Sequence, residues 1–298
     1  MTQNKCCRHG ASLRRRRRRR RKILRSIIFS CSIIAVAVFV AVGSRMITSG
    51  DGGTNRYDVE AGNNTYDNAV IENSKISEKN KIQNEQSMLD DIMNSTKYPK
   101  QLQELALKNE EALEFVYDYP TEHVKEHTID LTEEASMDSV HLFVQWDKRW
   151  GYEKYSGNFF AASGCGPTTL SMVVVYLTHN RDASPIAVAK YSKEAGYSVD
   201  GSGSSWTLIS EGCRHYGVKA KTVALDESRM KAELDAGHPI VVNVGPGDFT
   251  DTGHFMVITG YDDEGFSIND PNSIEKSGKR WLFKNISSQI RAVWSMYV

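Results

Sequence analysis

The sequence predicts an α+β domain over residues 140–298. Two observations carry this prediction: helical patterns fill the first half of the region, and strand patterns with a hairpin turn signal fill the second. The region has about 160 residues, which is enough for one sizeable core. The whole chain is 40% hydrophobic and 25% charged, as in ordinary globular proteins.

The helical and strand patterns follow one another along residues 140–298. The apolar run GCGPTTLSMVVVYLT, which contains Cys165, predicts a buried helix, and further helices are expected at about 185–195 and 206–216. The later segments PIVVNV, HFMVITGY, GFSIND and RAVWSMY predict strands. The tetrapeptide DDEG between the second and third strands is a hairpin turn signal, so these two strands are expected to pair.

The N-terminus predicts a membrane anchor with the remainder of the chain outside the cell. Residues 1–25, a basic cytoplasmic tail, hold 12 Lys or Arg and no acidic residue. Residues 26–43 then carry no charge and are just long enough to span a bilayer. Basic flanks stay in the cytoplasm, which also explains the arginine run at 14–21 better than nucleic-acid binding does. A cleaved signal remains the alternative, but the apolar run exceeds the usual signal length.

Two segments separate this anchor from the predicted domain. Residues 44–95 are rich in Asn, Gly, Ser and acidic residues, which predicts a disordered linker. Residues 96–139 form a helical extension, in which Pro99 suits a first helical turn and Pro120 a stop. Removing the 12 basic residues of the tail from the total of 37 leaves 25, against 37 acidic residues, so the rest of the chain has a net charge of −12. This balance either favours basic partners or keeps the domain soluble.

Cys165 is the first candidate catalytic residue. It lies between Gly164 and Gly166 where the buried helix begins, and Pro167 suits the first turn of that helix. A thiol at a helix N-terminus meets the positive end of the helix dipole and free N–H groups, which favour the thiolate and can stabilise an oxyanion. The alternative is a buried structural cysteine, because free cysteine is commonly interior.

His254 and Asp270 are the candidate partners of that thiol. His254 begins one strand of the predicted hairpin, and Asp270 ends the returning strand. Asp270 could then accept a hydrogen bond from the His254 ring and hold the useful tautomer. Asn269 and Asn272 are rivals for this role, although the two-residue period of a strand places Asn269 on the other face. Otherwise, His254 is a half-buried histidine and Asp270 a turn residue before proline.

Further candidates contribute to substrate binding. The Gln145 side chain could complete an oxyanion hole with the Cys165 N–H, although an ordinary polar residue is the simpler interpretation. Trp206, after a Gly/Ser-rich loop, is a possible substrate contact or a core residue. Gly164 and Gly253, beside Cys165 and His254, allow close backbone approach.

No metal or cofactor is expected, since the chain has no CxxC pattern and no EF-hand spacing. Cys213 is predicted to be a buried spare thiol. The alternative for this cysteine is a disulfide with Cys165, which would leave no nucleophile.

The segments FVQWDKRWG, SGCGPTTLSM, GHFMVITGYD and INDPNS together resemble the C39-like peptidases, a papain-like group that includes double-glycine leader peptidases. The resemblance covers about residues 140–298, and the order Gln145, Cys165, His254, Asp270 is similar to that of the family. It implies a papain-like fold, with the cysteine at a helix start packed on an antiparallel sheet that carries His and Asp. Leader peptidases of this family are cytoplasmic and fused to a transporter, so cleavage after Gly-Gly is not carried over.

The leading hypothesis is therefore a membrane-bound, extracellular thiol hydrolase that cleaves peptide or related amide bonds in peptide or protein substrates. The protein is expected to be a monomer that binds no nucleic acid. An acyl transferase, transglutaminase-like or peptide-ligating, would use the same residues, because only the nucleophile that resolves the acyl-enzyme differs. A non-catalytic cell-surface binding module is the third possibility, but the presence of all four site residues argues against it.

Overall fold

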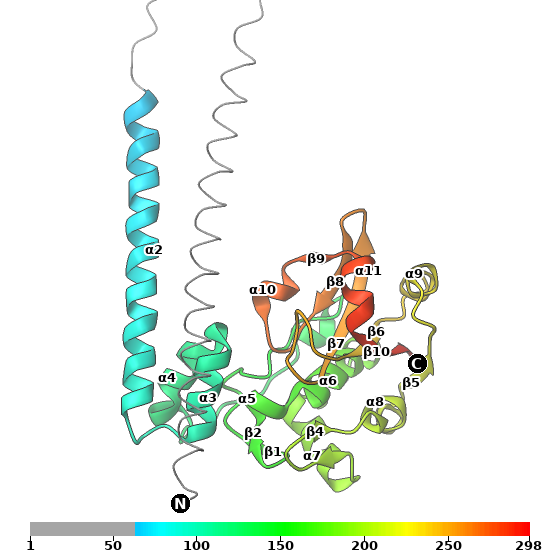
Figure 1. The fold of residues 1–298 in the computed structure, drawn as a ribbon. Helices are drawn as coiled ribbons and strands as arrows, with labels where there is room; N and C mark the ends of the chain where they lie inside the picture. The colour runs from blue at the N-terminus through cyan, green and yellow to red at the C-terminus, as the bar shows by residue number, and fades with distance from the viewer. Residues whose placement is uncertain (1–62) are drawn as a thin grey trace, which may run out of the picture. The chain divides into compact units, whose positions relative to one another are not determined.

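A computed structural model describes residues 63–298, with side chains from residue 75 onward (Figure 1). The basic tail and the predicted anchor at residues 26–43 lie outside the described residues. The chain divides into two units, residues 1–68 and residues 69–298. Among the helices that the structure describes, none is long and apolar enough to span a bilayer.

Helices dominate the first part of the described chain, and the strands of the main sheet follow from residue 219 onward. The α-helices are α2 (Asn63–Asn94), α3 (Lys100–Lys108), α4 (Leu113–Glu122), α5 (Phe160–Ser163), α6 (Cys165–Thr178), α7 (Pro185–Glu194), α8 (Thr207–Ser210), α9 (Glu227–Asp235), α10 (Ile274–Ser277) and α11 (Phe283–Ile286). Short 3-10 helices are η1 (Glu110–Ala112), η2 (Glu134–Ser136), η3 (Gly212–Tyr216) and η4 (Ser287–Gln289). The strands are β1 (Lys154–Tyr155), β2 (Asn158–Phe159), β3 (Ser198–Val199), β4 (Gly203–Ser204), β5 (Lys219–Thr222), β6 (Ile240–Val244), β7 (His254–Asp262), β8 (Gly265–Asn269), β9 (Arg280–Trp281) and β10 (Ile290–Tyr297).

The main sheet has six antiparallel strands in the order β5-β10-β6-β7-β8-β9. The central strands β6 and β7 are buried on both faces over residues 240–244 and 254–258. Alternate residues of each strand point to opposite sides of the sheet. Val241 and Val257 face the core that contains α6, whereas Val242 and Met256 face a second core on the other side. The predicted α+β class with an antiparallel sheet is confirmed.

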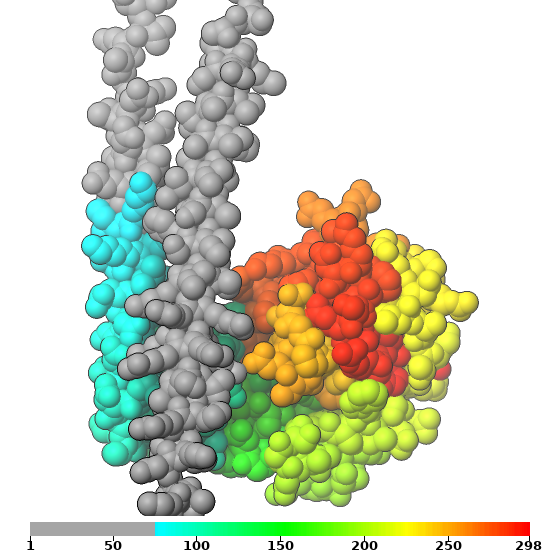
Figure 2. All heavy atoms as spheres, viewed as in Figure 1, coloured from blue at the N-terminus to red at the C-terminus, as the bar shows by residue number. Residues whose placement is uncertain are grey.

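Helix α6 is the central helix of the first core. Its apolar residues surround the whole helix axis, and ten of its residues, from Gly166 to Val175, are buried. It packs against β7 of the sheet and against α7. Figure 2 shows the orange and red C-terminal segments gathered in the upper part of this face, with green and yellow-green segments below them.

The linker predicted over residues 44–95 needs correction, because the structure has helix α2 at Asn63–Asn94. This stretch holds no Pro or Gly, and exposed pairs such as Gln86 and Asp90 support the helix at a spacing of four. Its last turn is anchored by Ile92, which is buried with residues of α3 and α4. The polar composition of residues 75–94 therefore goes with a largely exposed helix.

The helical extension consists of two helices, where the sequence predicted one. Asn109 interrupts it with an extended backbone, and its side chain accepts a hydrogen bond from the Glu111 N–H at 3.0 Å. Pro120 lies inside α4 and does not end it, because proline this near a C-terminus removes only one helical hydrogen bond. The extension packs on the following domain through a shared core that includes Phe159 and Ala161.

Candidate active site

Cys165 is the first residue of α6, and its thiol is half-buried. Gly164 precedes it as the N-cap and offers no side chain to the free N–H groups of the first turn. A Cβ atom at Gly164 would lie 2.6 Å from the buried ring of Phe160, so packing explains the glycine at this position. The thiol therefore meets the helix N-terminus directly, as the sequence predicts.

The sheet brings His254 and Asp270 together. His254 begins β7 opposite Val244 of β6, and Asp270 follows the last residue of β8, which pairs with β7. The ring of His254 donates from Nε2 to Oδ1 of Asp270 at 2.6 Å. Both side chains are buried, with exposed fractions of 6% and 0% for the two residues. Because Nε2 is occupied, Nδ1 is the ring nitrogen left to interact with the Cys165 thiol, and His254 and Cys165 each shift the pKa of the other.

The pKa values of the two groups shift toward an ion pair. Burial acts to lower the pKa of His254, but the charge and hydrogen bond of Asp270, together with Cys165, raise it to about 10. Burial acts to raise the pKa of Cys165, but the hydrogen bond and charge of His254 lower it below the usual thiol value. The backbone N–H groups of Phe255 and Gly166 act in the same direction. This arrangement favours a thiolate beside an imidazolium.

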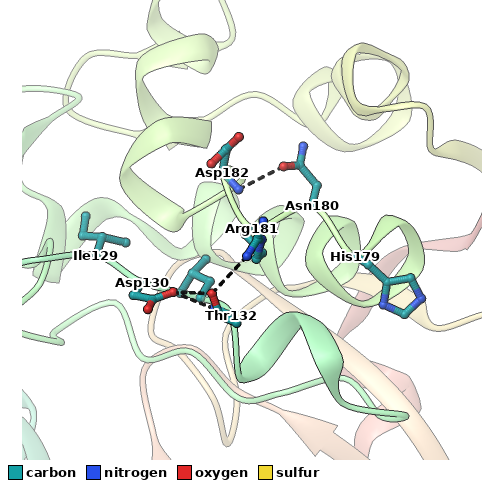
Figure 3. A pocket seen from close by; sticks show the side chains of 8 residues that line it. Ile129, Asp130, Thr132, His179, Asn180, Arg181 and Asp182 are labelled. Carbon is teal, nitrogen blue, oxygen red and sulfur yellow. Dashed lines mark hydrogen bonds between the residues drawn. The ribbon is translucent and has the colours of Figure 1, made fainter.

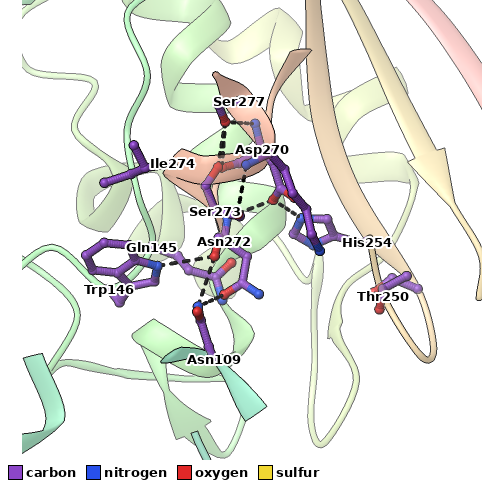
Figure 4. A network of polar contacts seen from close by, with 12 residues as sticks. Asn109, Gln145, Trp146, Thr250, His254, Asp270, Asn272, Ser273, Ile274 and Ser277 are labelled. Carbon is purple, nitrogen blue, oxygen red and sulfur yellow. Dashed lines mark hydrogen bonds and ion pairs between the residues drawn. The ribbon is translucent and has the colours of Figure 1, made fainter. Parts of the chain in front are cut away.

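A polar network holds Asp270 (Figure 4). Its Oδ1 also accepts from the Asn272 N–H at 2.8 Å, and its own N–H donates to Ser277 Oγ at 2.9 Å. The Asn272 side chain faces Asn109 at 3.1 Å, whereas Asn269 donates to the Val140 carbonyl. Of the three rivals, Asp270 is therefore the residue that the structure places against the His254 ring.

Gln145 lies buried between the two halves of the site, with an exposed fraction of 4%. It sits in a turn and not in a strand. Its Nε2 donates to the Ala161 carbonyl at 2.8 Å, four residues before Cys165, and its backbone N–H donates to the Pro271 carbonyl at 2.7 Å, next to Asp270. Its Oε1 is buried and has no hydrogen-bond partner among the described residues.

The other predicted contacts lie at the surface around this site. Trp206 is 49% exposed and stands edge to face with Trp294, at 6.0 Å between ring centroids. Trp294 in turn lies 6.4 Å from the ring of Phe255, whose N–H bonds the Cys165 sulfur. Gly253 is exposed beside His254, and a Cβ atom there would approach only the Val244 carbonyl, at 4.0 Å.

Cys213 is a free and fully buried thiol, and burial raises its pKa to about 11. Cys165 is free as well, so the structure joins neither to the other. Within residues 63–298, no group of His, Cys, Asp and Glu side chains is suited to hold a metal ion.

A cavity of about 390 Å³ lies elsewhere, at the other end of α6 (Figure 3). It is lined by residues 129–132 and 179–182, and by none of the predicted site residues. A helix of 14 residues is about 20 Å long, so this cavity is remote from the thiol.

A sequence profile of the Peptidase_C39 like family matches residues 137–298, more than half of the chain. The chain belongs to this family. Among solved structures, the peptidase domain of Streptococcus ComA, a bi-functional ABC transporter involved in a quorum sensing pathway, is 19% identical, with a TM-score of 0.37, over 45% of this chain and 90% of that domain. A protein of Bacillus anthracis described as a C39-like peptidase is 16% identical, with a TM-score of 0.33, over 57% of this chain and 98% of that one. No curated protein matches the chain.

The C39-like match supports an activity of the cysteine-peptidase type. Sequence reasoning missed two kinds of group at this site. The N–H donor of Phe255 belongs to the backbone of β7, so no residue type reveals it, whereas the Gly166 N–H is one of the helix N-terminal donors that the sequence predicts. Asn109 and Glu111 lie outside the family match, and their partners are more than 160 residues away, at 272–275.

Proposed function

We propose that the chain is a cysteine peptidase in which Cys165 is the nucleophile, His254 the acid and base, and Asp270 the residue that orients the ring. One observation carries this proposal: a thiol at the start of a buried helix shares a histidine with a buried carboxylate, at 2.6 Å between His254 Nε2 and Asp270 Oδ1. A lowered thiol pKa and a raised imidazole pKa are what thiolate catalysis requires near neutral pH.

The proposed reaction proceeds through a thioester. The Cys165 thiolate attacks the scissile carbonyl carbon, and the protonated His254 ring gives its Nδ1 proton to the leaving amine as the C–N bond breaks. Water then attacks the thioester carbonyl while neutral His254 takes its proton. The products are an amine and a carboxylic acid, and the thiolate–imidazolium pair is restored.

Gln145 is the proposed side-chain donor to the oxyanion. A primary amide has two N–H bonds, and the contact with the Ala161 carbonyl at 2.8 Å uses one of them. That contact fixes the amide plane, which leaves the second N–H available to an oxygen beside the Cys165 N–H. A buried donor fixed in advance is more effective than an exposed one, because no reorganisation accompanies the reaction.

The test uses the purified full-length chain and a peptide library, with cleavage products identified by mass spectrometry. We expect Cys165→Ala to abolish cleavage and His254→Ala to lower kcat by about 10²–10⁴, the usual contribution of acid–base catalysis. Cys213→Ala, the same change at a buried thiol, is the control and keeps kcat unchanged. Full activity of Cys165→Ala would refute the assignment. Products that incorporate an added amine would instead indicate acyl transfer.

We also propose that residues 26–43 anchor the chain in the membrane with residues 140–298 outside, and that its substrates are peptides or proteins. The support is the charge pattern of residues 1–43. Protease added to intact cells should then remove the C-terminal domain and spare the N-terminus. A protected C-terminal domain would contradict this topology.

A further inference from the structure

We propose that Asn109 and Glu111 of the helical extension are positioning residues for the catalytic carboxylate, holding the loop that follows Asp270 so that Asp270 stays against His254. The inference rests on the proposed function and deepens it. It assigns a role in that site to a segment outside the family match at residues 137–298.

Asn109 holds the loop through Asn272. Its Nδ2 donates to the Asn272 carbonyl at 2.9 Å and to the Asn272 side chain at 3.1 Å (Figure 4). The N–H of the same Asn272 donates to Asp270 Oδ1, the oxygen that binds His254. Asn109 has an exposed fraction of only 9%, so water competes weakly for these bonds. Three successive hydrogen bonds therefore join the extension to the catalytic ring.

Glu111 contacts the next residues of the same loop, at positions 273–275. Its Oε1 accepts from the Ser273 hydroxyl, and its Oε2 accepts from the N–H groups of Ile274 at 2.7 Å and Glu275 at 3.0 Å. These are the first N–H groups of α10, which would otherwise have no helical partner. Ser277 of α10 accepts from the Asp270 N–H at 2.9 Å, so fixing α10 also fixes the backbone of Asp270.

The peptidase domain also contacts this loop, at Pro271 and Asn272. Gln145 donates through its backbone N–H to the Pro271 carbonyl, and Trp146 donates through its ring N–H to the Asn272 carbonyl at 3.3 Å. The bonds from Asn109, at 2.9 and 3.1 Å, are shorter than the bond from Trp146 but longer than the bond from Gln145 at 2.7 Å. Glu111 alone accepts three bonds from the loop. Loss of the extension would free residues 272–275 and loosen the Asp270 carboxylate.

The consequence is a change in the ionisation of the catalytic pair. Asp270 is a principal cause that keeps His254 protonated, and protonated His254 in turn stabilises the Cys165 thiolate. Tyr155, whose pKa is raised by burial, also interacts with Cys165, and its hydroxyl bonds Ser192 and Ser204 and not the loop at residues 271–275. A loosened Asp270 therefore weakens the imidazolium and raises the pH at which the thiolate forms.

The experiment measures thiolate formation without a substrate. The full-length protein is alkylated with iodoacetamide between pH 4 and pH 10, and the rate at Cys165 is read by peptide mass spectrometry. The variants are Asn109→Ser, which keeps an oxygen to cap η1 but loses the amide donor, and Glu111→Ala. Glu114→Ala, an exposed glutamate on the same extension, is the charge-matched control. The melting temperature of each variant is recorded alongside.

In the plot of alkylation rate against pH, the acidic limb is the range in which the rate rises as the Cys165 thiolate forms. We expect Asn109→Ser and Glu111→Ala to shift this limb to higher pH by about one unit, so that alkylation at a given pH on the limb is about tenfold slower. Rates should converge at high pH, where every thiol is ionised, and Glu111→Gln should recover part of the shift. A lower melting temperature with an unchanged limb in both variants would overturn the inference, since the residues would then be merely structural. A wild-type limb at the ordinary thiol value of about 8.5 would instead refute the catalytic pair itself.

Discussion

His254 donates from Nε2 to Oδ1 of Asp270 at 2.6 Å, and the two side chains are almost completely buried. The second carboxylate oxygen, Oδ2, is also buried and has no hydrogen-bond partner among the described residues. A buried, charged carboxylate needs a hydrogen-bonded partner, because removing its charge from water costs free energy. The His254–Asp270 hydrogen bond therefore orients the imidazole ring and also offsets the desolvation cost of the carboxylate.

Asp270→Asn should lower kcat less than His254→Ala does, by about tenfold, because an amide oxygen can still accept from the ring but carries no charge. Asn272→Ala should have a smaller effect, since the Asn272 side chain faces Asn109 and the N–H that binds Asp270 remains. Both are measured as kcat on the peptide found in the library screen. A silent Asp270→Asn together with a damaging Asn272→Ala would move the orienting role to Asn272.

Gln145→Ala should lower kcat by about 10²–10³ with little change in KM, as expected when one oxyanion donor is lost. Gln103→Ala is the matched control, because this half-buried glutamine of α3 donates only to carbonyls of residues 95 and 98. Steady-state kinetics separates the two constants. If Gln145→Ala raises KM and leaves kcat intact, Gln145 binds substrate in the ground state and the oxyanion is stabilised elsewhere.

Stability should depend on pH through His254. Its pKa is raised to about 10 in the folded chain, against an ordinary value of about 6.5, so this stabilisation is complete below pH 6.5 and is lost as pH rises. The Cys165 thiolate contributes to stability with the opposite pH dependence. Both proteins in the comparison therefore carry Cys165→Ala, which removes this contribution. The melting-temperature gap between Cys165→Ala and Cys165→Ala/Asp270→Asn should be largest near pH 6 and shrink toward pH 10. A gap that is constant or widens would contradict the raised pKa.

Cys213 should not react in the native protein. It is fully buried, and its pKa is raised to about 11, so little thiolate is present at neutral pH. Iodoacetamide at pH 7 should label Cys165 at least tenfold faster than Cys213, with equal labelling after denaturation. A Cys165–Cys213 disulfide in active protein would be incompatible with Cys165 as the nucleophile.

The elements that the sequence predicts well are those whose apolar pattern is local. The run after Cys165 is helix α6, and the segments at 239–244, 254–261 and 265–270 are β6, β7 and β8 within a residue or so. Strand β5 was missed, because its sequence KAKT lies at a sheet edge and lacks an apolar face. A polar edge strand gains its structure from the neighbouring β10, a long-range effect that no local window contains.

The same reasoning explains what could be predicted of the site. Cys165, His254 and Asp270 can be proposed from the sequence because a helix start and a hairpin place them by local geometry. Asn109 and Glu111 carry no such signal: each suits a helix cap, and their second role exists only because the fold brings residues 272–275 against them. Contacts of this kind become visible only when the tertiary structure is known.

The burial of α6 from Gly166 to Val175 has a consequence for how a substrate would be accommodated. Amide hydrogens in this buried stretch of the helix should exchange slowly with solvent, because exchange there requires opening of the core. The sulfur is thus carried by one of the most rigid parts of the molecule. Residues 246–248 and 251–253, beside His254, are exposed instead. In the proposed peptidase, adaptation to different peptide sequences would therefore fall to that loop and to the substrate, while the Cys165 sulfur would keep a fixed position.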